Sequence, residues 1–283
     1  MSIDTETARL IGLFQFPFMQ RALLSSVVTG LLGGLLGSFA ILRQLSFFSD
    51  ALGHSALLGI TLGLLLNISP VLVLLPFAVL FGLGMLYLLE RTQLSTDALL
   101  NIIYSSSVAL AVIALTFIKS YKGSLTQLLF GDILAVRETD LLLSILLLLV
   151  CAVFLGLTLR TQMLLTLHES LAKAQGIAVQ TQRTWFVVLL SLVVALSIKA
   201  VGVLLVSTFI VFPASTARLL SQRFTGYILM STGLGALNAV TGLGLSAALN
   251  LPSGPSIVIT QMALFLLTIA LSSLRLISSP EGI

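Results

Sequence analysis

The stretch that decides the fold is LLLSILLLLVCAVFLGLTL, residues 141–159, which contains no charged side chain. A helix needs about 20 predominantly apolar residues to cross the hydrocarbon core of a bilayer, so this stretch predicts one membrane-spanning helix. The rest of the chain has the same character, because 58% of its 283 residues are hydrophobic and only 8% are charged. So few polar side chains cannot cover a soluble globule, and we expect an integral membrane protein.

Apolar stretches of similar size recur along the chain. Turn residues at Asn67 to Pro70 and at Asn250 to Pro255 separate consecutive spans. Residues 184–217 contain only one charge, at Lys199, and are too long for one ordinary span, so Lys199 and Gly202 predict two shorter helices that meet at a membrane surface. The other spans are expected over 22–42, 51–66, 71–89, 98–118, 141–159 and, on either side of the second turn, within 224–274. The predicted fold is an all-α, polytopic helical bundle of nine transmembrane helices, or eight if 184–217 crosses once.

The chain divides into one transmembrane domain with short flanking segments. Residues 1–20 lack the order of a secretory signal and are expected to lie along the membrane surface. Residues 21–276 form the transmembrane domain, which includes a hydrophilic segment at 160–183, and residues 277–283 form a tail. Basic residues slightly favour the side that holds 160–183, so we expect this segment and the carboxyl terminus in the cytosol and the amino terminus outside.

Composition also argues against several functions. The net charge is +4, but the fourteen basic residues are scattered between apolar runs, so we expect no nucleic-acid partner. Cys151 is the only cysteine and lies in an apolar run, which predicts a small core residue and rules out an intramolecular disulfide. The sequence has no Gly-x-x-x-x-Gly-Lys-Ser/Thr phosphate loop, so ATP hydrolysis by that route requires another polypeptide.

Small residues four positions apart predict close helix packing, because they let helix backbones approach in lipid. One such residue, Gly59, lies nine positions after Asp50 and therefore roughly on the opposite side of the same helix. We expect one face of this helix to pack while the other faces a pathway. The pairs are Gly30 and Gly34, Gly33 and Gly37, Gly59 and Gly63, and Gly242 and Ser246.

Asp50 and His54 are the candidate metal ligands. They are four residues apart at the head of an apolar stretch, so a carboxylate and an imidazole share one helix face. These ligand types suit zinc, manganese or ferrous iron, and ionisable residues within a membrane mark functional sites by default. The alternative is an interfacial aspartate at a helix start beside a hydrogen-bonded packing histidine. With only two histidines and one buried thiol, a closed four-ligand site is not expected, and weak capture suits passage of an ion.

Six stretches, in order, resemble the membrane subunits of bacterial zinc, manganese and iron ABC importers. The resemblance covers nearly the whole chain and implies a permease of the type II importer kind in the bacterial inner membrane. The stretches are Pro17–Ala22, Asp50–Ala56, Leu129–Val136, Val201–Ser207, Pro213–Arg218 and Leu251–Gly254.

The resemblance also implies roles and partners. Asp50 and His54 match the family residues that line the metal path between two permease copies. The working unit would hold this homodimer, two ATPase subunits and an extracytoplasmic metal-binding protein, with the transported ion as substrate and no covalently bound cofactor. His168 departs from the family, which has an acidic residue there. The segment that docks into the ATPase is implied to include Glu169, Leu171, Ala172, Ala174 and Gly176.

Charged residues between the fourth and fifth spans predict either a docking surface for the metal-binding protein or an ordinary hydrated loop. They are Lys119, Lys122, Asp132, Arg137, Glu138 and Asp140. Two functions remain as alternatives to metal import by an ABC transporter: a permease for an iron chelate or another cofactor, and a secondary metal transporter. A zinc protease is not expected, because the sequence lacks His-Glu-x-x-His.

Overall fold

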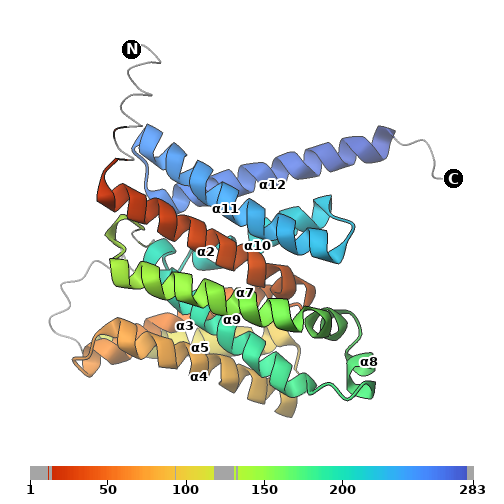
Figure 1. Ribbon diagram of the computed structural model, residues 1–283. Coiled ribbons are helices and arrows are strands. Elements are labelled where there is room, and N and C mark those ends of the chain that lie inside the picture. The colour runs from red at the N-terminus through yellow and green to blue at the C-terminus, as the bar shows by residue number, and fades with distance from the viewer. Residues whose placement is uncertain (1–11, 13–14, 93, 118–130, 132, 279–283) are drawn as a thin grey trace.

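The computed structural model describes residues 12, 15–92, 94–117, 131 and 133–278, and this part of the chain is almost entirely helical (Figure 1). The all-α prediction is therefore confirmed. The elements are α2 (Pro17–Leu42), α3 (Ser46–Leu65), α4 (Pro70–Arg91), α5 (Thr96–Leu115), the 3-10 turn η1 (Ile133–Ala135), α7 (Glu138–Leu167), α8 (Glu169–Ala174), α9 (Val179–Val201), α10 (Val206–Leu220), α11 (Phe224–Leu249) and α12 (Ser253–Ser278).

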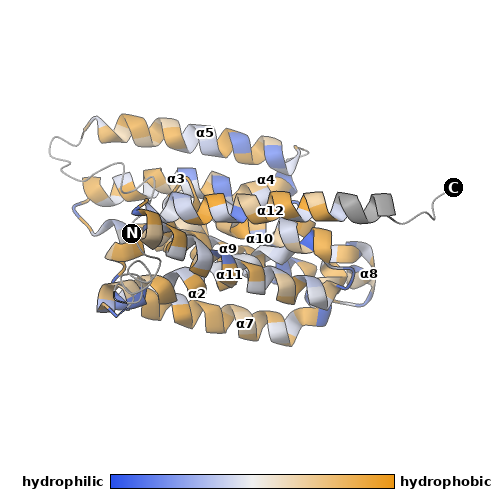
Figure 2. Cartoon of the chain, turned by 90° about the horizontal axis from the view of Figure 1, so that it is seen from above, coloured by the Kyte–Doolittle hydropathy of each residue, from blue (hydrophilic) through white to orange (hydrophobic). Residues whose placement is uncertain are grey.

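Eight helices of the described chain are long and apolar enough to cross a membrane, and α10 is a shorter apolar helix. The long helices are mostly hydrophobic along their length, and hydrophilic colour gathers in short patches such as α8 and parts of α5 (Figure 2). The turns predicted at Asn67 and Asn250 are confirmed, because α4 begins at Pro70 and Asn250 ends α11 in the left-handed conformation with φ 51°.

Two predicted boundaries are wrong. Helix α7 continues to Leu167, so the first third of the segment expected to be a hydrophilic connection is helix. Helix α9 begins at Val179 and is 23 residues long, so only α10 is short. In both places a long helix carries polar side chains on its final or first turns, which a search for apolar residues excludes from the span.

The predicted flanking segments lie mostly outside the described residues. Helix α2 already begins at Pro17, which occupies the first helical turn where its missing N–H costs nothing. Residues 1–11 and 13–14 are not described, so a surface location for the amino-terminal segment stays a prediction. Of the predicted tail, residues 277–278 belong to α12 and residues 279–283 are not described.

Helix α2 packs against two helices through backbone contacts that only glycine permits. A Cβ atom added at Gly30 would lie 2.3 Å from the carbonyl oxygen of Gly235 in α11, and one at Gly34 would lie 2.3 Å from that of Ser231. Gly33 and Gly37 make equally close approaches to the carbonyl oxygens of α10. The predicted small-residue packing is confirmed, and it makes α2 the axis against which α10 and α11 are placed.

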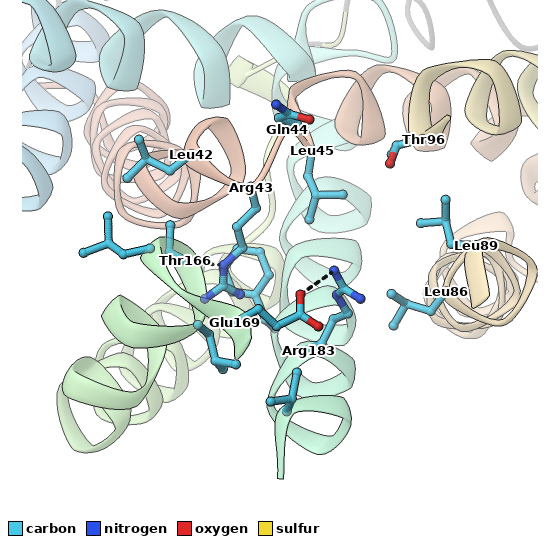
Figure 3. Close-up of a pocket in the computed structure, with 14 residues that line it drawn as sticks. Leu42, Arg43, Gln44, Leu45, Leu86, Leu89, Thr96, Thr166, Glu169 and Arg183 are labelled. Atoms are coloured by element: carbon cyan, nitrogen blue, oxygen red, sulfur yellow. Dashed lines mark hydrogen bonds and ion pairs between the residues drawn. The ribbon is translucent and has the colours of Figure 1, made fainter. Parts of the chain in front are cut away.

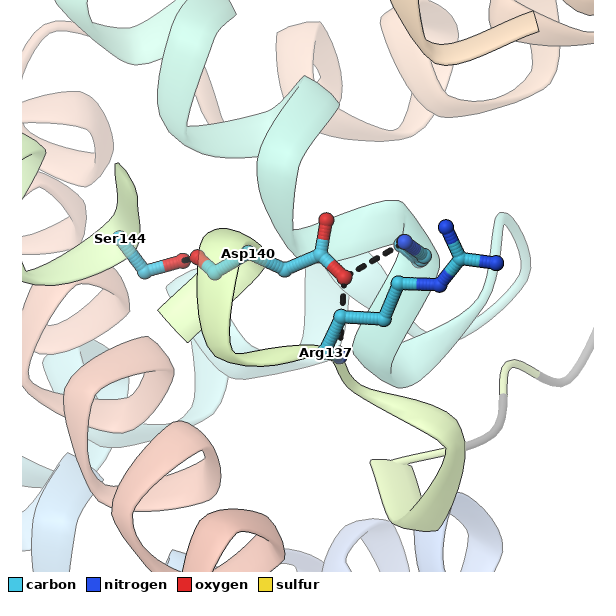
Figure 4. A network of polar contacts seen from close by, with 4 residues as sticks. Arg137, Asp140 and Ser144 are labelled. Atoms are coloured by element: carbon cyan, nitrogen blue, oxygen red, sulfur yellow. Dashed lines mark hydrogen bonds and ion pairs between the residues drawn. The ribbon is translucent and has the colours of Figure 1, made fainter. Parts of the chain in front are cut away.

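Polar contacts around Asp140 mark one end of the bundle, which is called the Asp140 end. At the Asp140 end, Lys199 of α9 donates to Asp140 of α7 at 2.5 Å, and Arg21 of α2 pairs with Glu138 at 3.3 Å. Asp140 also accepts the backbone N–H of Arg137, at 3.0 Å, and so caps α7 (Figure 4). The opposite end holds α8 and is called the α8 end (Figure 1).

Helix α10 begins near the middle of the bundle. The backbone of its residues Phe209 and Ile210 lies against Gly33 and Gly37, which are about midway between Arg21 and Arg43 along α2. The chain reaches this point from the Asp140 end through residues 202–205, and Gly202 makes the turn possible with φ 94°. The amino terminus of a short helix is thus placed roughly halfway along the bundle.

We predict that Gly235→Ala destabilises the protein by about 1–3 kcal/mol, because the new methyl group would overlap the backbone of Gly30. Thermal unfolding of the purified protein in detergent measures the effect. Gly233→Ala is the matched control, since it lies two residues away in the same helix and its Cβ would meet nothing within 4 Å. That control should be neutral or slightly stabilising. Equal melting temperatures for the two variants would contradict the packing described.

Candidate functional site

Asp50 and His54 lie one turn apart on α3, near its start at Ser46. The structure brings the two side chains together, with 3.8 Å between Nε2 of His54 and Oδ1 of Asp50. The side chain of His54 is 21% exposed and that of Asp50 is 31% exposed, so both are reachable from outside this chain. The opposite face of α3 packs as predicted, because Gly59 lies against Phe77 of α4.

Ser207 is a third member of the site that the sequence analysis did not single out. Its hydroxyl donates a hydrogen bond of 3.2 Å to Oδ1 of Asp50. Ser207 is in the first turn of α10, so the carboxylate also lies beside a helix amino terminus, where partial positive charge stabilises an anion. In the sequence, Ser207 is indicated only by its position at the end of the Val201–Ser207 stretch, and this stretch carries no ionisable residue.

A close backbone approach holds α3 against the turn before α10. A Cβ atom at Gly53 would lie 3.0 Å from the carbonyl oxygen of Val203 and 3.1 Å from Cγ1 of Val206. A larger side chain at this position would push α3 away from the first turn of α10. The glycine that precedes His54 therefore keeps Asp50 within hydrogen-bonding distance of Ser207.

Helix α5 supplies the surroundings of His54. The ring of Tyr104 meets that of His54 edge to face, with 5.0 Å between the ring centroids and 60° between the planes. The next residue on the same helix, Ser105, is exposed, and its hydroxyl donates to Oδ1 of Asn101, one turn earlier, at 3.2 Å. Exposed hydroxyl and amide groups within a predicted span form a hydrophilic patch on α5 (Figure 2). Tyr104 was also missed from the sequence, because an aromatic residue in a span has no distinctive spacing.

An open cavity of about 310 Å³ adjoins Asp50. Within the described residues, no group of three or more histidine, cysteine, aspartate or glutamate side chains is placed to hold a metal ion. Asp50 and His54 therefore offer an incomplete set of ligands that water, hydroxyl groups or a second protein surface would have to complete. The cavity is lined by Ser46, Phe47, Asp50, Ser207, Thr208, Val211 and Phe212.

The residues expected to dock onto an ATPase form the short helix α8 and the turn after it. Gly176 ends α8 with φ 74°, and the N–H groups of Gly176 and Ile177 donate to the carbonyl oxygens of Lys173 and Ala172. This is the Schellman arrangement, which favours glycine at the left-handed position. Leu171 is 46% exposed, whereas Ala172 is fully buried beneath the helix. Leu171, Ala174 and Gln175 thus share the exposed side, as predicted, and Ala172 supports it from below.

Ion pairs hold α8 in place. Glu169 pairs with Lys173 at 2.8 Å and with Arg183 of α9 at 3.7 Å, and the second pair borders a cavity of about 360 Å³ (Figure 3). The hydrogen bond from Lys173, with a further contribution from the Arg183 charge, lowers the pKa of Glu169. The stabilisation is therefore present at neutral pH and is lost as pH falls through the lowered pKa. His168 is an exposed side chain, as predicted.

The charged loop expected to meet a metal-binding protein is only partly described. Lys119, Lys122 and Asp132 lie outside the described residues. Of the remaining charges, Glu138 and Asp140 are paired with Arg21 and Lys199 within the chain. The Arg137 side chain is exposed and extends away from the Asp140 contact (Figure 4).

Comparisons with known proteins agree with this architecture. The chain is 34% identical to the manganese import system permease protein ScaB of Streptococcus gordonii, over 91% of this chain and 92% of ScaB. It is 32% identical to the high-affinity zinc uptake system membrane protein ZnuB of Haemophilus influenzae, over 90% of this chain and 97% of ZnuB.

A solved structure is also similar along nearly its whole length. It is that of PsaBC from Streptococcus pneumoniae in complex with Fab, with a TM-score of 0.81 and 31% identity over 93% of this chain and 95% of the matched chain. Residues 15–272 match the ABC 3 transport family, and the chain belongs to that family.

Proposed function

We propose that this protein is the membrane-spanning permease subunit of an ATP-driven importer that moves a divalent metal ion, manganese or zinc, into the cytoplasm. Family membership and eight apolar spans make it a multi-pass protein of the bacterial inner membrane. Manganese and zinc are the metals named for the relatives ScaB and ZnuB. Iron, the third metal expected from the sequence, is not named for either of these relatives.

The observation that carries the proposal is the grouping of Asp50, His54 and Ser207 beside an open cavity about halfway across the membrane. An unpaired charge at the centre of a spanning helix costs about 2.5–3.5 kcal/mol on insertion scales. The Ser207 hydroxyl and the start of α10 offset part of this cost for Asp50. The side chain of Asp50 can therefore serve as an oxygen ligand for a cation that enters from the cavity.

The incomplete ligand set favours transport over storage. Two protein side chains replace only part of the hydration shell of a divalent cation, so the ion can leave as readily as it enters. A second permease copy opposite the cavity would add its own aspartate and histidine to the path. This arrangement supports alternating access by a homodimer and gives no role to a covalently bound cofactor.

ATP hydrolysis belongs to a partner in this proposal. The exposed side of α8, with Leu171 and Ala174, supports docking into the ATPase, with Glu169 and Gly176 fixing the two ends of the helix. Two ATPase subunits would bind the α8 end of the permease dimer, which places that end in the cytoplasm. An extracytoplasmic metal-binding protein would then approach the Asp140 end, where Arg137 is exposed.

We predict that Asp50→Asn and His54→Ala each reduce uptake of radiolabelled manganese or zinc to the level of cells that lack the protein. Each substitution removes a ligand, while the fold is preserved because both side chains are partly exposed. Uptake is measured at limiting metal, with membrane levels of the permease checked by immunoblot.

The matched controls are Asp97→Asn and His168→Ala, which change the same residue types outside the cavity. Both controls should transport normally. Normal uptake by either Asp50→Asn or His54→Ala would show that the path does not pass this pair.

We predict that Leu171→Asp prevents stable association with the ATPase. A carboxylate on the exposed side of α8 would be buried unpaired in the complex, which costs several kcal/mol. Copurification of tagged permease with its ATPase from detergent extracts measures the loss. Gln180→Asp, an exposed residue in the first turn of α9, is the control and should copurify normally. Unchanged ATPase recovery with Leu171→Asp would remove α8 from the proposed interface.

A further inference from the structure

Arg43 is a partly buried cation for which the proposed function has so far supplied no role. It directly follows α2 at the α8 end and lies in the wall of the cavity shown in Figure 3. Burial, with a smaller contribution from the nearby Arg183 charge, lowers the pKa of Arg43 to about 10. The guanidinium is therefore still charged at neutral pH, and its surroundings have to compensate that charge.

The compensation comes from the end of α7. Nε of Arg43 donates to Oγ1 of Thr166 at 3.0 Å, and Nη2 donates to Gln162 twice, at 2.6 Å to Oε1 and at 3.2 Å to the backbone oxygen. Gln162 is fully buried, and its amide in turn donates to Gln182 of α9 at 2.9 Å. One side chain thus ties α2 to α7 and, through Gln162, to α9.

Aromatic rings fix the direction of the guanidinium. Its carbon atom lies 4.4 Å from the ring centroid of Phe186 in α9 and 5.6 Å from that of Phe39 in α2. Cation–π contacts of the broad guanidinium with two rings suit arginine and are not reproduced by the compact ammonium of lysine. The contacts with the two rings therefore fix the orientation of the guanidinium at the end of α2 and stabilise its positive charge.

The connection from Arg43 to the metal site is short and stiff. Gln44 follows in the left-handed conformation with φ 57°, and the N–H groups of Gln44 and Leu45 donate to Ile41 and Ala40. These bonds form a Schellman arrangement, and α3 begins immediately afterwards at Ser46. Asp50 is only seven residues beyond Arg43, and the N–H of Phe48 donates to the carbonyl oxygen of Leu45 in the first turn of α3.

The other side of the contact is equally close to the coupling helix. Thr166 precedes the first residue of α8, Glu169, by three positions. The hydrogen bonds of Arg43 therefore join the segment that enters α8 to the turn that enters α3. A displacement of one of these segments would be carried to the other through groups that are already in contact.

We infer that Arg43 is a positioning residue that makes the α2–α3 turn, and with it Asp50, follow the movement of the α7–α8 junction. The inference rests on the proposed function, because it assigns the path by which the ATPase would act on the metal site. Arg43 itself contacts neither the ion nor the ATPase in this arrangement.

The first test measures metal carried per ATP hydrolysed, using the complete transporter in inverted membrane vesicles. Removing hydrogen bonds to a buried charged group weakens the link by about tenfold or more, so Arg43→Met and Gln162→Leu should lower the ratio by about that factor. Basal ATPase activity and assembly should stay normal. Arg43→Lys should also lower the ratio, since lysine keeps the positive charge and loses the planar guanidinium group. Arg160→Met, an exposed arginine two residues before Gln162, is the control with an unchanged ratio.

The second test follows the metal site without transport. Ser46→Cys places a thiol in the cavity beside Asp50, and the native Cys151 is buried and gives little background. Labelling of Ser46→Cys by a charged maleimide should change on addition of ATP, and Arg43→Met should abolish that change. If Arg43→Met fails to assemble, the labelling of Ser46→Cys combined with Gln162→Leu provides the test, because that substitution leaves Arg43 in contact with its aromatic rings.

Three results would overturn the inference: a normal ratio in both Arg43→Met and Gln162→Leu, labelling that responds to ATP in both, or labelling that ignores ATP with Arg43 intact. Failure of the proposed function is distinguishable from these. In that case no manganese or zinc loaded into the lumen of the inverted vesicles is carried out on addition of ATP, while the labelling of Ser46→Cys still responds to ATP through Arg43.

Discussion

A carboxylate placed halfway across a bilayer has to be compensated by dipoles, because water is not available there in bulk. In this protein the compensation comes from a helix that starts in the middle of the membrane. Helix α10 can start there because the chain turns at Gly202 and because Gly33 and Gly37 let its backbone lie directly against α2. The candidate site therefore depends on glycines that are themselves remote from any ligand chemistry.

The same constraint explains which parts of the site could be predicted from the sequence. Asp50 and His54 are conspicuous because ionisable residues are rare in apolar stretches and because a spacing of four places both on one helix face. Ser207 and Tyr104 lie on other helices and come 157 and 54 residues after Asp50, respectively. Their side chains are ordinary for a spanning helix, and only the packing of α3 against α5 and α10 gives them a role.

The fold was predictable to a similar degree and for a similar reason. Hydropathy locates the spans, and the turns at Asn67 and Asn250 are visible because asparagine and proline interrupt apolar runs. Hydropathy cannot locate the end of α7 or the start of α9, since the polar side chain of Gln162 is buried there by pairing with the half-buried Gln182. A short apolar helix such as α10 is equally ambiguous, because its depth is set by its contacts with α2.

Helix α7 has 30 residues and, at about 1.5 Å per residue, is roughly 45 Å long, whereas the hydrocarbon core of a bilayer is about 30 Å thick. Residues 160–167, its last two turns, follow the uncharged stretch that ends at Leu159 and therefore lie beyond the hydrocarbon core. Helix α8 is consequently attached to a continuous helix that holds it outside the hydrocarbon core. An ATPase can then bind α8 without displacing lipid from the hydrocarbon core, and bilayer thickness would have little influence on that contact.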